Sequence, residues 1–479
     1  MGHSVRKACS LRSHLGDAPG LYKGIGFQTH LIGAAHGGTI SGSKTPQGME
    51  HSDMASDLVL DASCKGYPVA AAPCAVSQLG DRGWNLLQDA LAYPVAVLRR
   101  PALTHNLRWM QDFVQRKGVA LAPHGKTTMS PELFRMQLQA GAWGMTFANV
   151  HQLRVGLAAG AQRAIIANQL VSDADLDGLD GLLRQHPQAQ VWFLVDSLAQ
   201  LQALADWAKR RGNARCWDVL LELGIAGYRT GCRTHEQALA LAQAIAASPF
   251  VRLGGVECYE GGLGQCDSAH DTEAVSALVR SVNALVQQID AQNLWGSDEV
   301  LLSAGGSAVF DLVIPMLKLQ VQSRPVQGVL RSGCYVTHDH WNYARYLKLV
   351  EAREGLSASL QPALEVWAVV QSVPEPGLAI LSAGRRDLSF DQCMPMPVRW
   401  AARGHSGPDA MQTTPDSWQV KALSDQHAHM AFDADGVWPQ VGDRVALGIS
   451  HPCTTFDKWR WMAVIEDDGR ISGAISTHF

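Results

Sequence analysis

Short apolar runs separated by longer amphipathic segments succeed one another from residue 93 onward. Eight of these runs indicate strands buried on both faces, because their apolar residues are continuous rather than alternating. They are residues 119–123, 144–150, 164–168, 191–195, 218–223, 253–258, 299–303 and 328–331. The intervening segments, such as PELFRMQLQAGA, carry apolar residues at helical spacing. Eight strand-helix units in about 240 residues predict a (β/α)8 TIM barrel, an α/β fold whose active site lies at the carboxyl ends of its strands.

The pattern changes after Asp339 to shorter β-like runs with many prolines and glycines, which predicts a mainly antiparallel β domain. We therefore expect a barrel over residues 93–340 and a C-terminal β domain over 341–479. Residues 56–92 are expected to associate with the β domain. Residues 1–55 lack periodicity and predict a disordered extension, or a start codon placed too far upstream. A doubly wound open sheet is less favoured for the first part, because no GxGxxG follows the first strand.

Composition narrows the function classes. The 479 residues carry a net charge of -4, with 47% hydrophobic and 18% charged residues, as in a soluble globular protein. No run is long enough for a membrane span or a secretory signal, so a cytoplasmic protein is expected. The absence of a lysine or arginine cluster argues against nucleic acid as a partner. Ten cysteines without a CxxC pair argue against a disulfide framework or a zinc ribbon.

The ends of the predicted strands carry residues that could perform chemistry. Lys126 follows the first strand in LAPHGKTTMS, where an ammonium is costly to desolvate unless its charge is used. A Schiff base with an aldehyde cofactor provides such a use. Glycine-rich turns follow strands seven and eight, where barrels bind phosphate through backbone N–H groups. Together these features predict pyridoxal phosphate. The structural alternatives are a snorkelling surface lysine and ordinary tight turns.

Three pairs of residues separated by one position could each face a metal ion in an extended segment, and spacing alone does not choose among them. The pairs are His338 with His340, His427 with His429, and His451 with Cys453. For the first pair, polar residues at a domain junction are the preferred interpretation.

Three stretches carry a resemblance to a known family: PHGKT with the sequence that follows it to residue 171, GCYV, and SHPCTTFDKW. They resemble the D-serine dehydratase and D-threonine aldolase family of alanine racemase-like, fold type III pyridoxal phosphate enzymes, with bacterial D-serine deaminase-like enzymes nearest. The resemblance runs from about Tyr93 to the C-terminus. It implies a cofactor on Lys126, a C-terminal β domain and a homodimer.

The resemblance also implies roles for individual residues. Tyr259 would lie close to the cofactor ring, Arg229 near its phenolic oxygen, and Gln169 also near the cofactor. The phosphate would rest on Gly305, Gly306, Ser307, Gly333 and Cys334.

The same resemblance selects His451 and Cys453 as metal ligands, because SHPC falls where related enzymes carry a histidine and a second ligand two residues later. That second ligand resembles cysteine in the dehydratases and aspartate in the aldolases. A thiolate with an imidazole favours zinc over harder ions. His427, in SDQH, is a further candidate for a residue near the active site.

These features predict a dehydratase, or ammonia-lyase, that converts D-serine or a related β-hydroxy D-amino acid to a 2-oxo acid and ammonia. Lys126 would remove the α-proton, and zinc would stabilise negative charge on the departing oxygen. Retro-aldol cleavage to glycine and an aldehyde is the nearest alternative. A racemase would need a second acid/base, for which no residue is nominated. A non-catalytic protein of vitamin B6 homeostasis is less favoured, because such barrels lack the β domain and the HPC stretch.

Overall fold

The computed structural model describes residues 57–212 and 215–479. Eight parallel strands form one sheet in the order β4-β11-β10-β9-β8-β7-β6-β5. Their bounds are β4 (Ala120–Leu121), β5 (Met145–Phe147), β6 (Arg163–Gln169), β7 (Gln190–Val195), β8 (Trp217–Glu222), β9 (Val251–Glu257), β10 (Val300–Ala304) and β11 (Val326–Leu330). Each of the eight predicted runs contains or overlaps one of these strands. The predicted barrel is therefore confirmed.

The two end strands of this sheet meet at a short seam. A parallel bridge joins His124 to Thr146. The Thr146 N–H donates to the carbonyl of Pro123 at 2.9 Å, and the Thr146 hydroxyl donates to the carbonyl of Ala122 at 2.7 Å. These bonds bring β4 and β5 together just before Lys126, so the barrel is nearly closed.

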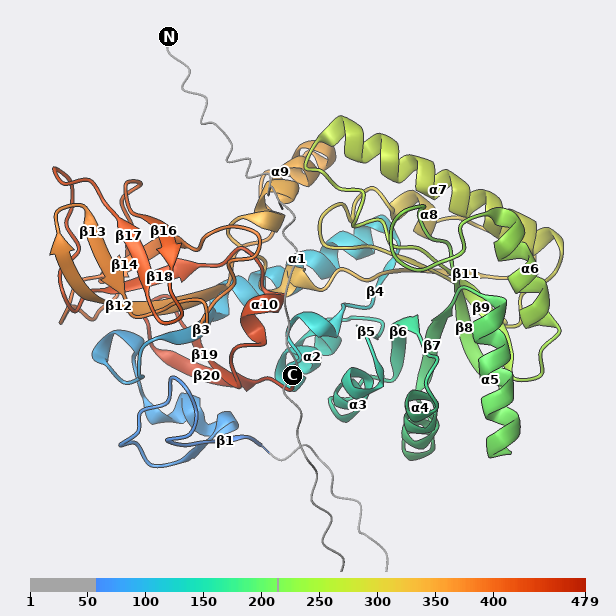
Figure 1. Ribbon diagram of the computed structural model, residues 1–479, viewed down its shortest axis with the longest axis horizontal. Coiled ribbons are helices and arrows are strands. Elements are labelled where there is room, and N and C mark those ends of the chain that lie inside the picture. Colours follow the sequence, from blue (N-terminus) through green and yellow to red (C-terminus); the bar gives the residue numbers. More distant parts are fainter. Residues whose placement is uncertain (1–56, 213–214) are drawn as a thin grey trace, which may run out of the picture. The chain divides into compact units, whose positions relative to one another are not determined.

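Helices cover the outside of the barrel strands (Figure 1). They are α1 (Arg100–Lys117), α2 (Pro131–Gln139), α3 (Val150–Ala158), α4 (Asp173–Gln185), α5 (Leu198–Arg211), α6 (His235–Ala246), α7 (Ser268–Ala291) and the short α8 (Ile314–Leu317). Side chains at the N-caps of six of them accept backbone N–H groups and so satisfy donors that a helix start leaves free. These caps are Ser130, Asn149, Ser172, Ser197, Thr234 and Asp267.

A second sheet of ten strands, mostly antiparallel, follows α9 (Asn342–Glu354) and confirms the predicted C-terminal β domain. Its strands from this part of the chain are β12 (Leu364–Glu375), β13 (Leu378–Leu381), β14 (Met396–Ala401), β15 (Gln412–Thr413), β16 (Gln419–Leu423), β17 (Ala428–Ala431), β18 (Arg444–Gly448), β19 (Trp461–Ile465) and β20 (Ile471–Ser476). The short helix α10 (Cys453–Phe456) lies between β18 and β19.

The tenth strand of this sheet comes from the N-terminal side of the barrel. β3 (Val95–Arg99) pairs antiparallel with β12 and parallel with β19. The expected barrel boundary at residue 93 therefore differs from the structure, in which the chain leaves the β sheet through α1 before it enters the barrel. An apolar run such as VAVLR predicts a strand, but nothing local to it specifies the sheet that it joins.

Residues before β3 also pack on the β domain. Leu60, Tyr67 and Leu79 belong to a hydrophobic cluster that includes Trp367 and Trp461. The expected extension over residues 1–55 lies outside the described residues. Within the described ranges, no helix is long and apolar enough to cross a membrane.

A buried asparagine on α1 ties the barrel to the connection into the β domain. Asn106 is 0% exposed. Its amide donates to the carbonyls of Val336 and Gln361 at 3.1 and 2.7 Å, and its carbonyl accepts the N–H of Gln361 at 2.7 Å. Removal of this side chain takes a partner from three backbone groups, the buried Val336 carbonyl and two partly buried groups of Gln361, and each loss costs free energy.

We predict that Asn106→Ala lowers the free energy of unfolding by about 2–4 kcal/mol, because one buried and two partly buried hydrogen bonds are lost at once. The midpoint of urea unfolding measures this. Gln202→Ala on the exposed face of α5 is the control, since the Gln202 amide donates to Asp206 in an exposed hydrogen bond. Equal midpoints for the two variants would contradict the role of Asn106.

Candidate active site

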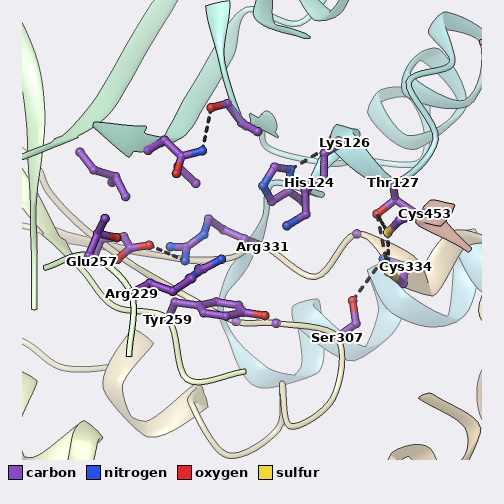
Figure 2. Close-up of a pocket in the computed structure, with 18 of the residues that line it drawn as sticks. His124, Lys126, Thr127, Arg229, Glu257, Tyr259, Ser307, Arg331, Cys334 and Cys453 are labelled. Carbon is purple, nitrogen blue, oxygen red and sulfur yellow. Dashed lines mark hydrogen bonds and ion pairs between the residues drawn. The ribbon is translucent and has the colours of Figure 1, made fainter. Parts of the chain in front are cut away.

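A cavity of about 390 Å³ opens at the carboxyl ends of the barrel strands. Ten of the eleven predicted site residues line it: Lys126, Arg229, Tyr259, Gly305, Gly306, Ser307, Gly333, Cys334, His451 and Cys453. In Figure 2, Glu257 and Cys453 lie on opposite sides of Lys126. Residues from both sheets therefore meet at one place, although more than 300 positions separate Lys126 from Cys453.

Lys126 lies in the 3-10 turn η3 (Gly125–Thr127) directly after the barrel seam. A Cβ atom at Gly125 would come within 2.8 Å of the rings of Phe134 and Phe147, so a side chain here would displace the turn. Within the described residues, the Lys126 amine has no hydrogen-bond or ion-pair partner. Its side chain is exposed to the cavity rather than desolvated, which corrects the expectation of a buried amine. The amine is free to react.

His124, which the sequence analysis did not assign, caps this turn. Its Nδ1 accepts the backbone N–H of Lys126 at 3.4 Å. Burial lowers the pKa of His124 well below its ordinary value, and the nearby cations Lys126, Arg331 and Arg229 lower it further. The imidazole is therefore neutral and adds no positive charge beside the amine. Its position in PHGK, two residues before the lysine, was the signal available in the sequence.

The two glycine turns after β10 and β11 contact each other and the lysine turn. Gly305 has a φ of 113°, a conformation that favours glycine. A Cβ atom at Gly333 would lie 2.4 Å from the carbonyl oxygen of His124. The Ser332 hydroxyl donates to the Gly306 carbonyl at 2.7 Å, and Ser307 Oγ accepts the Cys334 N–H at 3.2 Å. The close approach of the backbones explains the glycines.

The buried carboxylate of Glu260 contacts the glycine turn that follows β10. Glu260 accepts the N–H groups of Gly305 and Gly306 at 3.1 and 2.6 Å. Burial raises the pKa of Glu260, and these N–H groups oppose the shift. The N–H groups of Gly305 and Gly306, which the sequence predicts to bind a phosphate, therefore donate to the Glu260 side chain.

Tyr259 forms one wall of the cavity beside Arg229. The guanidinium of Arg229 lies 4.3 Å from the centre of the Tyr259 ring, and the Tyr228 ring is nearly parallel to it at 6.4 Å. Burial raises the pKa of Tyr259 to about 12, so its hydroxyl remains protonated near neutral pH. The cation on the aromatic face holds both side chains in place.

The cavity lining contains a buried ion pair that was not predicted from the sequence. Arg331 and Glu257 are 2.6 Å apart, and their side chains are 3% and 2% exposed. Arg331 also donates to Ser303 Oγ and to the carbonyl of Cys258. Burial raises the pKa of Glu257, and the charge of Arg331 opposes this shift. Both residues line the cavity, and Glu257 Oε2 has no hydrogen-bond partner. In the sequence, the only sign of this ion pair is one charged residue at the end of each of two apolar runs, Glu257 at the end of β9 and Arg331 directly after β11.

Gln169 is the one predicted residue that does not line the cavity. Its amide donates to Glu222 Oε2 at 2.5 Å and to Asp196 Oδ2 at 3.2 Å. Glu222 and the neighbouring Asn168 line the cavity instead. Gln169 therefore supports Glu222 from behind. Adjacent residues on a strand point to opposite faces, so a choice between them from sequence alone depends on register.

The β domain contributes His451 and Cys453 to the cavity. His451 Nδ1 lies 2.6 Å from Asp391 Oδ2, which orients the ring and leaves its other nitrogen available. The Cys453 thiol donates to Thr127 Oγ1 at 3.5 Å, and its sulfur lies 3.8 Å from that of Cys334.

The charges and donor atoms of this corner fit a soft metal ion. The hydrogen bond between the two sulfurs lowers the pKa of Cys334 to about 6. The same hydrogen bond, together with burial and the charge of Cys334, raises the pKa of Cys453. An oriented imidazole beside two sulfurs, one of which ionises readily, is a donor set that suits zinc. Among residues 57–212 and 215–479, no group of three or more candidate ligands that could hold a metal is found.

The other two histidine pairs lie outside the cavity lining. His338 is 3% exposed and its Nδ1 lies 3.1 Å from the carbonyl of Asp339, while His340 Nδ1 is buried without a partner. His427 is exposed, and His429 on β17 lies 3.3 Å from Ser424 Oγ. The structure thus brings one of the three candidate pairs to the cavity.

Comparison with known proteins places both parts of the chain. Residues 98–315 match the family model "Alanine racemase, N-terminal domain", and residues 363–465 match "Putative serine dehydratase domain". The chain is 27% identical to D-threonine aldolase from Arthrobacter sp., over 78% of this chain and 89% of that one. It is 28% identical to D-threo-3-hydroxyaspartate dehydratase from Delftia sp. (strain HT23), over 64% of this chain and 76% of that one.

Solved structures show the same fold. The crystal structure of D-threonine aldolase from Filomicrobium marinum has a TM-score of 0.68 at 23% identity and covers 82% of this chain and 96% of that one. Solved forms of D-threo-3-hydroxyaspartate dehydratase include a histidine-to-alanine variant and, two positions later, a cysteine-to-alanine variant in a metal-free form. The latter has a TM-score of 0.64 at 22% identity and covers 82% of this chain and 99% of that one.

The histidines near the domain junction predict a pH-dependent stability. Burial lowers the pKa of both His338 and His340 from 6.5 to about 4. The unfolded chain therefore takes up protons first as the pH falls. Their contribution to stability is complete above pH 6.5 and is lost toward pH 4, at roughly 1 kcal/mol per group per pH unit.

Thermal unfolding between pH 7 and pH 5 is expected to show this loss in the unmodified protein and a shallower dependence in His338→Gln. His405→Gln, at an exposed position, serves as the control and should follow the unmodified protein. If the stability of His338→Gln falls with decreasing pH as steeply as that of the unmodified protein, buried His338 is not a source of the pH dependence.

Proposed function

Because the chain belongs to the D-serine dehydratase and D-threonine aldolase family of fold type III pyridoxal phosphate enzymes, we propose that it is a lyase acting on β-hydroxy D-amino acids. We further propose dehydration of D-serine, or of a related substrate, to a 2-oxo acid and ammonia. The observation that carries the proposal is the free Lys126 amine, which faces a cavity bordered by two glycine turns and by His451 and Cys453.

The cavity fits pyridoxal phosphate. Lys126 would hold the cofactor, Tyr259 would border its ring, and the turns that carry Ser307 and Gly333 would hold its phosphate. When bound, the cofactor supplies an electron-withdrawing ring that stabilises negative charge at the substrate Cα. The buried Glu257 Oε2, which lacks a partner in the protein, provides an acceptor for a polar group of a bound molecule.

The chain's own residues then move the α-proton. Lys126 is the one flexible amine in the cavity lining, and it takes the proton from Cα as a general base. His124 remains neutral and Tyr259 keeps its proton, so neither competes as a strong base near neutral pH. Arg229, at the face of Tyr259, contributes positive charge for the substrate carboxylate or for the cofactor.

Dehydration is favoured by the pair His451 and Cys453. We propose that the free nitrogen of His451 and the Cys453 sulfur hold a zinc ion, with Asp391 as the residue that orients the imidazole. When bound, zinc supplies Lewis acidity to the β-hydroxyl oxygen and so makes it a better leaving group. The metal-free form of the cysteine-to-alanine variant of the related dehydratase supports this assignment.

Retro-aldol cleavage is the second candidate function, and the D-threonine aldolase relative supports it. The two reactions need the same amine and the same metal, but break different bonds at the β-carbon. Dehydration of D-serine gives pyruvate and ammonia, whereas cleavage of D-threonine gives glycine and acetaldehyde. Product identity therefore separates them.

We predict that purified protein with pyridoxal phosphate has a visible absorption band that Lys126→Ala lacks, since the amine is the attachment point. Activity should fall by at least about a thousandfold in that variant. Lys117→Ala, which removes a lysine paired with Glu354, is the control and should keep both. Borohydride treatment followed by peptide mass analysis should label Lys126. A coloured, active Lys126→Ala protein would exclude the proposal.

A panel of D-serine, D-threonine and 3-hydroxy-D-aspartate, with detection of 2-oxo acids and of glycine, tests the reaction type. Chelation, or Cys453→Ala, should reduce 2-oxo acid formation by at least about a hundredfold, because Lewis-acid stabilisation is worth several kcal/mol. Added zinc should restore the chelated protein but not the variant. Glycine as the main product would favour the aldolase, and full activity after chelation would exclude the metal.

A further inference from the structure

The Glu260 carboxylate lies at the beginning of the glycine turn that follows β10. Its residue is 0% exposed and directly follows Tyr259, in the turn after β9. One oxygen accepts the Gly306 N–H at 2.6 Å and the other accepts the Gly305 N–H at 3.1 Å. Both oxygens are thus used by consecutive backbone donors, and the carbonyl of Glu260 accepts the Leu263 N–H at 2.8 Å.

This arrangement determines which donors remain for an anion. While Glu260 holds the first two N–H groups of the turn, they are not available to a phosphate. The Ser332 hydroxyl donates to the Gly306 carbonyl at 2.7 Å. The turn is therefore held by two side chains, those of Glu260 and Ser332. The next residue, Ser307, faces the second turn, where its Oγ lies 3.2 Å from the Cys334 nitrogen.

A carboxylate close to an anion site is unfavourable for phosphate binding, because its negative charge repels the phosphate. The hydrogen bonds of Glu260 can offset this cost. Two charge-assisted bonds to adjacent N–H groups fix the turn before a ligand arrives, which reduces the entropy lost on binding. Gly305, with its φ of 113°, is a residue whose backbone would otherwise sample other conformations.

We propose that Glu260 is a positioning residue for the cofactor phosphate. It fixes the Gly305–Gly306 turn so that the N–H and hydroxyl of Ser307 face the anion, which they bind together with the backbone N–H of Gly333, while the Cys334 N–H stays on Ser307 Oγ. The N–H groups of Gly305 and Gly306 stay on Glu260 in the cofactor-bound enzyme. This inference rests on the proposed function, because it assumes that pyridoxal phosphate occupies the cavity.

The test compares pyridoxal phosphate with pyridoxal, which has the same aldehyde but no phosphate. Apoprotein is titrated with each, and absorbance reports binding. Glu260→Gln keeps the size of the side chain but replaces one acceptor oxygen with an NH2 group. It should weaken binding of pyridoxal phosphate about tenfold and change that of pyridoxal by less than about twofold.

The matched control is Asp271→Asn on α7. Asp271 is also 0% exposed and accepts a backbone N–H, that of Gln265 at 2.8 Å, outside the cavity lining. This variant should leave the ratio of the two affinities unchanged, even if it lowers stability. Equal losses for both ligands in Glu260→Gln would overturn the inference, since a general structural defect acts on both alike.

Amide hydrogen exchange of the unmodified protein provides a test that does not depend on the folding of a variant. The Gly305 and Gly306 amides should be protected without cofactor and equally protected with it, while Ser307 gains protection on binding. Rapid exchange at Gly305 and Gly306 in the apoprotein would overturn the inference. An unmodified protein that binds neither pyridoxal phosphate nor pyridoxal would instead overturn the proposed function, and with it the inference.

Discussion

The closure of the barrel beside Lys126 is the constraint on which the rest of the site depends. Thr146 joins β5 to the end of β4 through its N–H and its hydroxyl. The turn that carries Lys126 follows at once, fixed by the His124 cap and by the contact of Gly125 with two phenylalanine rings. A flexible side chain on a rigid turn can reach a ligand without the cost of ordering the backbone each time.

Buried charges around the cavity are arranged so that the reactive amine remains free. Glu257 pairs with Arg331, and Glu260 is held by backbone N–H groups. Each carboxylate thereby has partners other than the lysine. An unpaired buried carboxylate near the cavity would instead attract Lys126 into an ion pair and hold it protonated. The unpartnered amine of Lys126 is thus a consequence of how neighbouring acids are satisfied.

The β domain completes the site because of the path of the chain. β3 is the first strand of the ten-stranded sheet along the chain, and α1 then leads into the barrel. After β11 the chain returns to the ten-stranded sheet and forms its other nine strands. Asn106 secures this crossing on the buried side of α1. As a result, α10 brings Cys453 to Thr127 and Cys334, which lie on barrel turns. The sulfur pair at the cavity therefore exists only when both sheets are assembled.

The sequence by itself determined the eight barrel strands, the antiparallel C-terminal sheet and Lys126, while its resemblance to a known family selected Tyr259, His451 and Cys453, which the cavity also gathers. Continuous apolar runs are local patterns, and they indicate buried strands whatever the rest of the chain does. Only the tertiary structure decided that β3 joins the β sheet, that Asn168 rather than Gln169 lines the cavity, and that Glu260 occupies the N–H groups of Gly305 and Gly306. The reason is that sheet partner, strand register and buried polar pairing depend on contacts between residues far apart in the chain, and no local pattern encodes them.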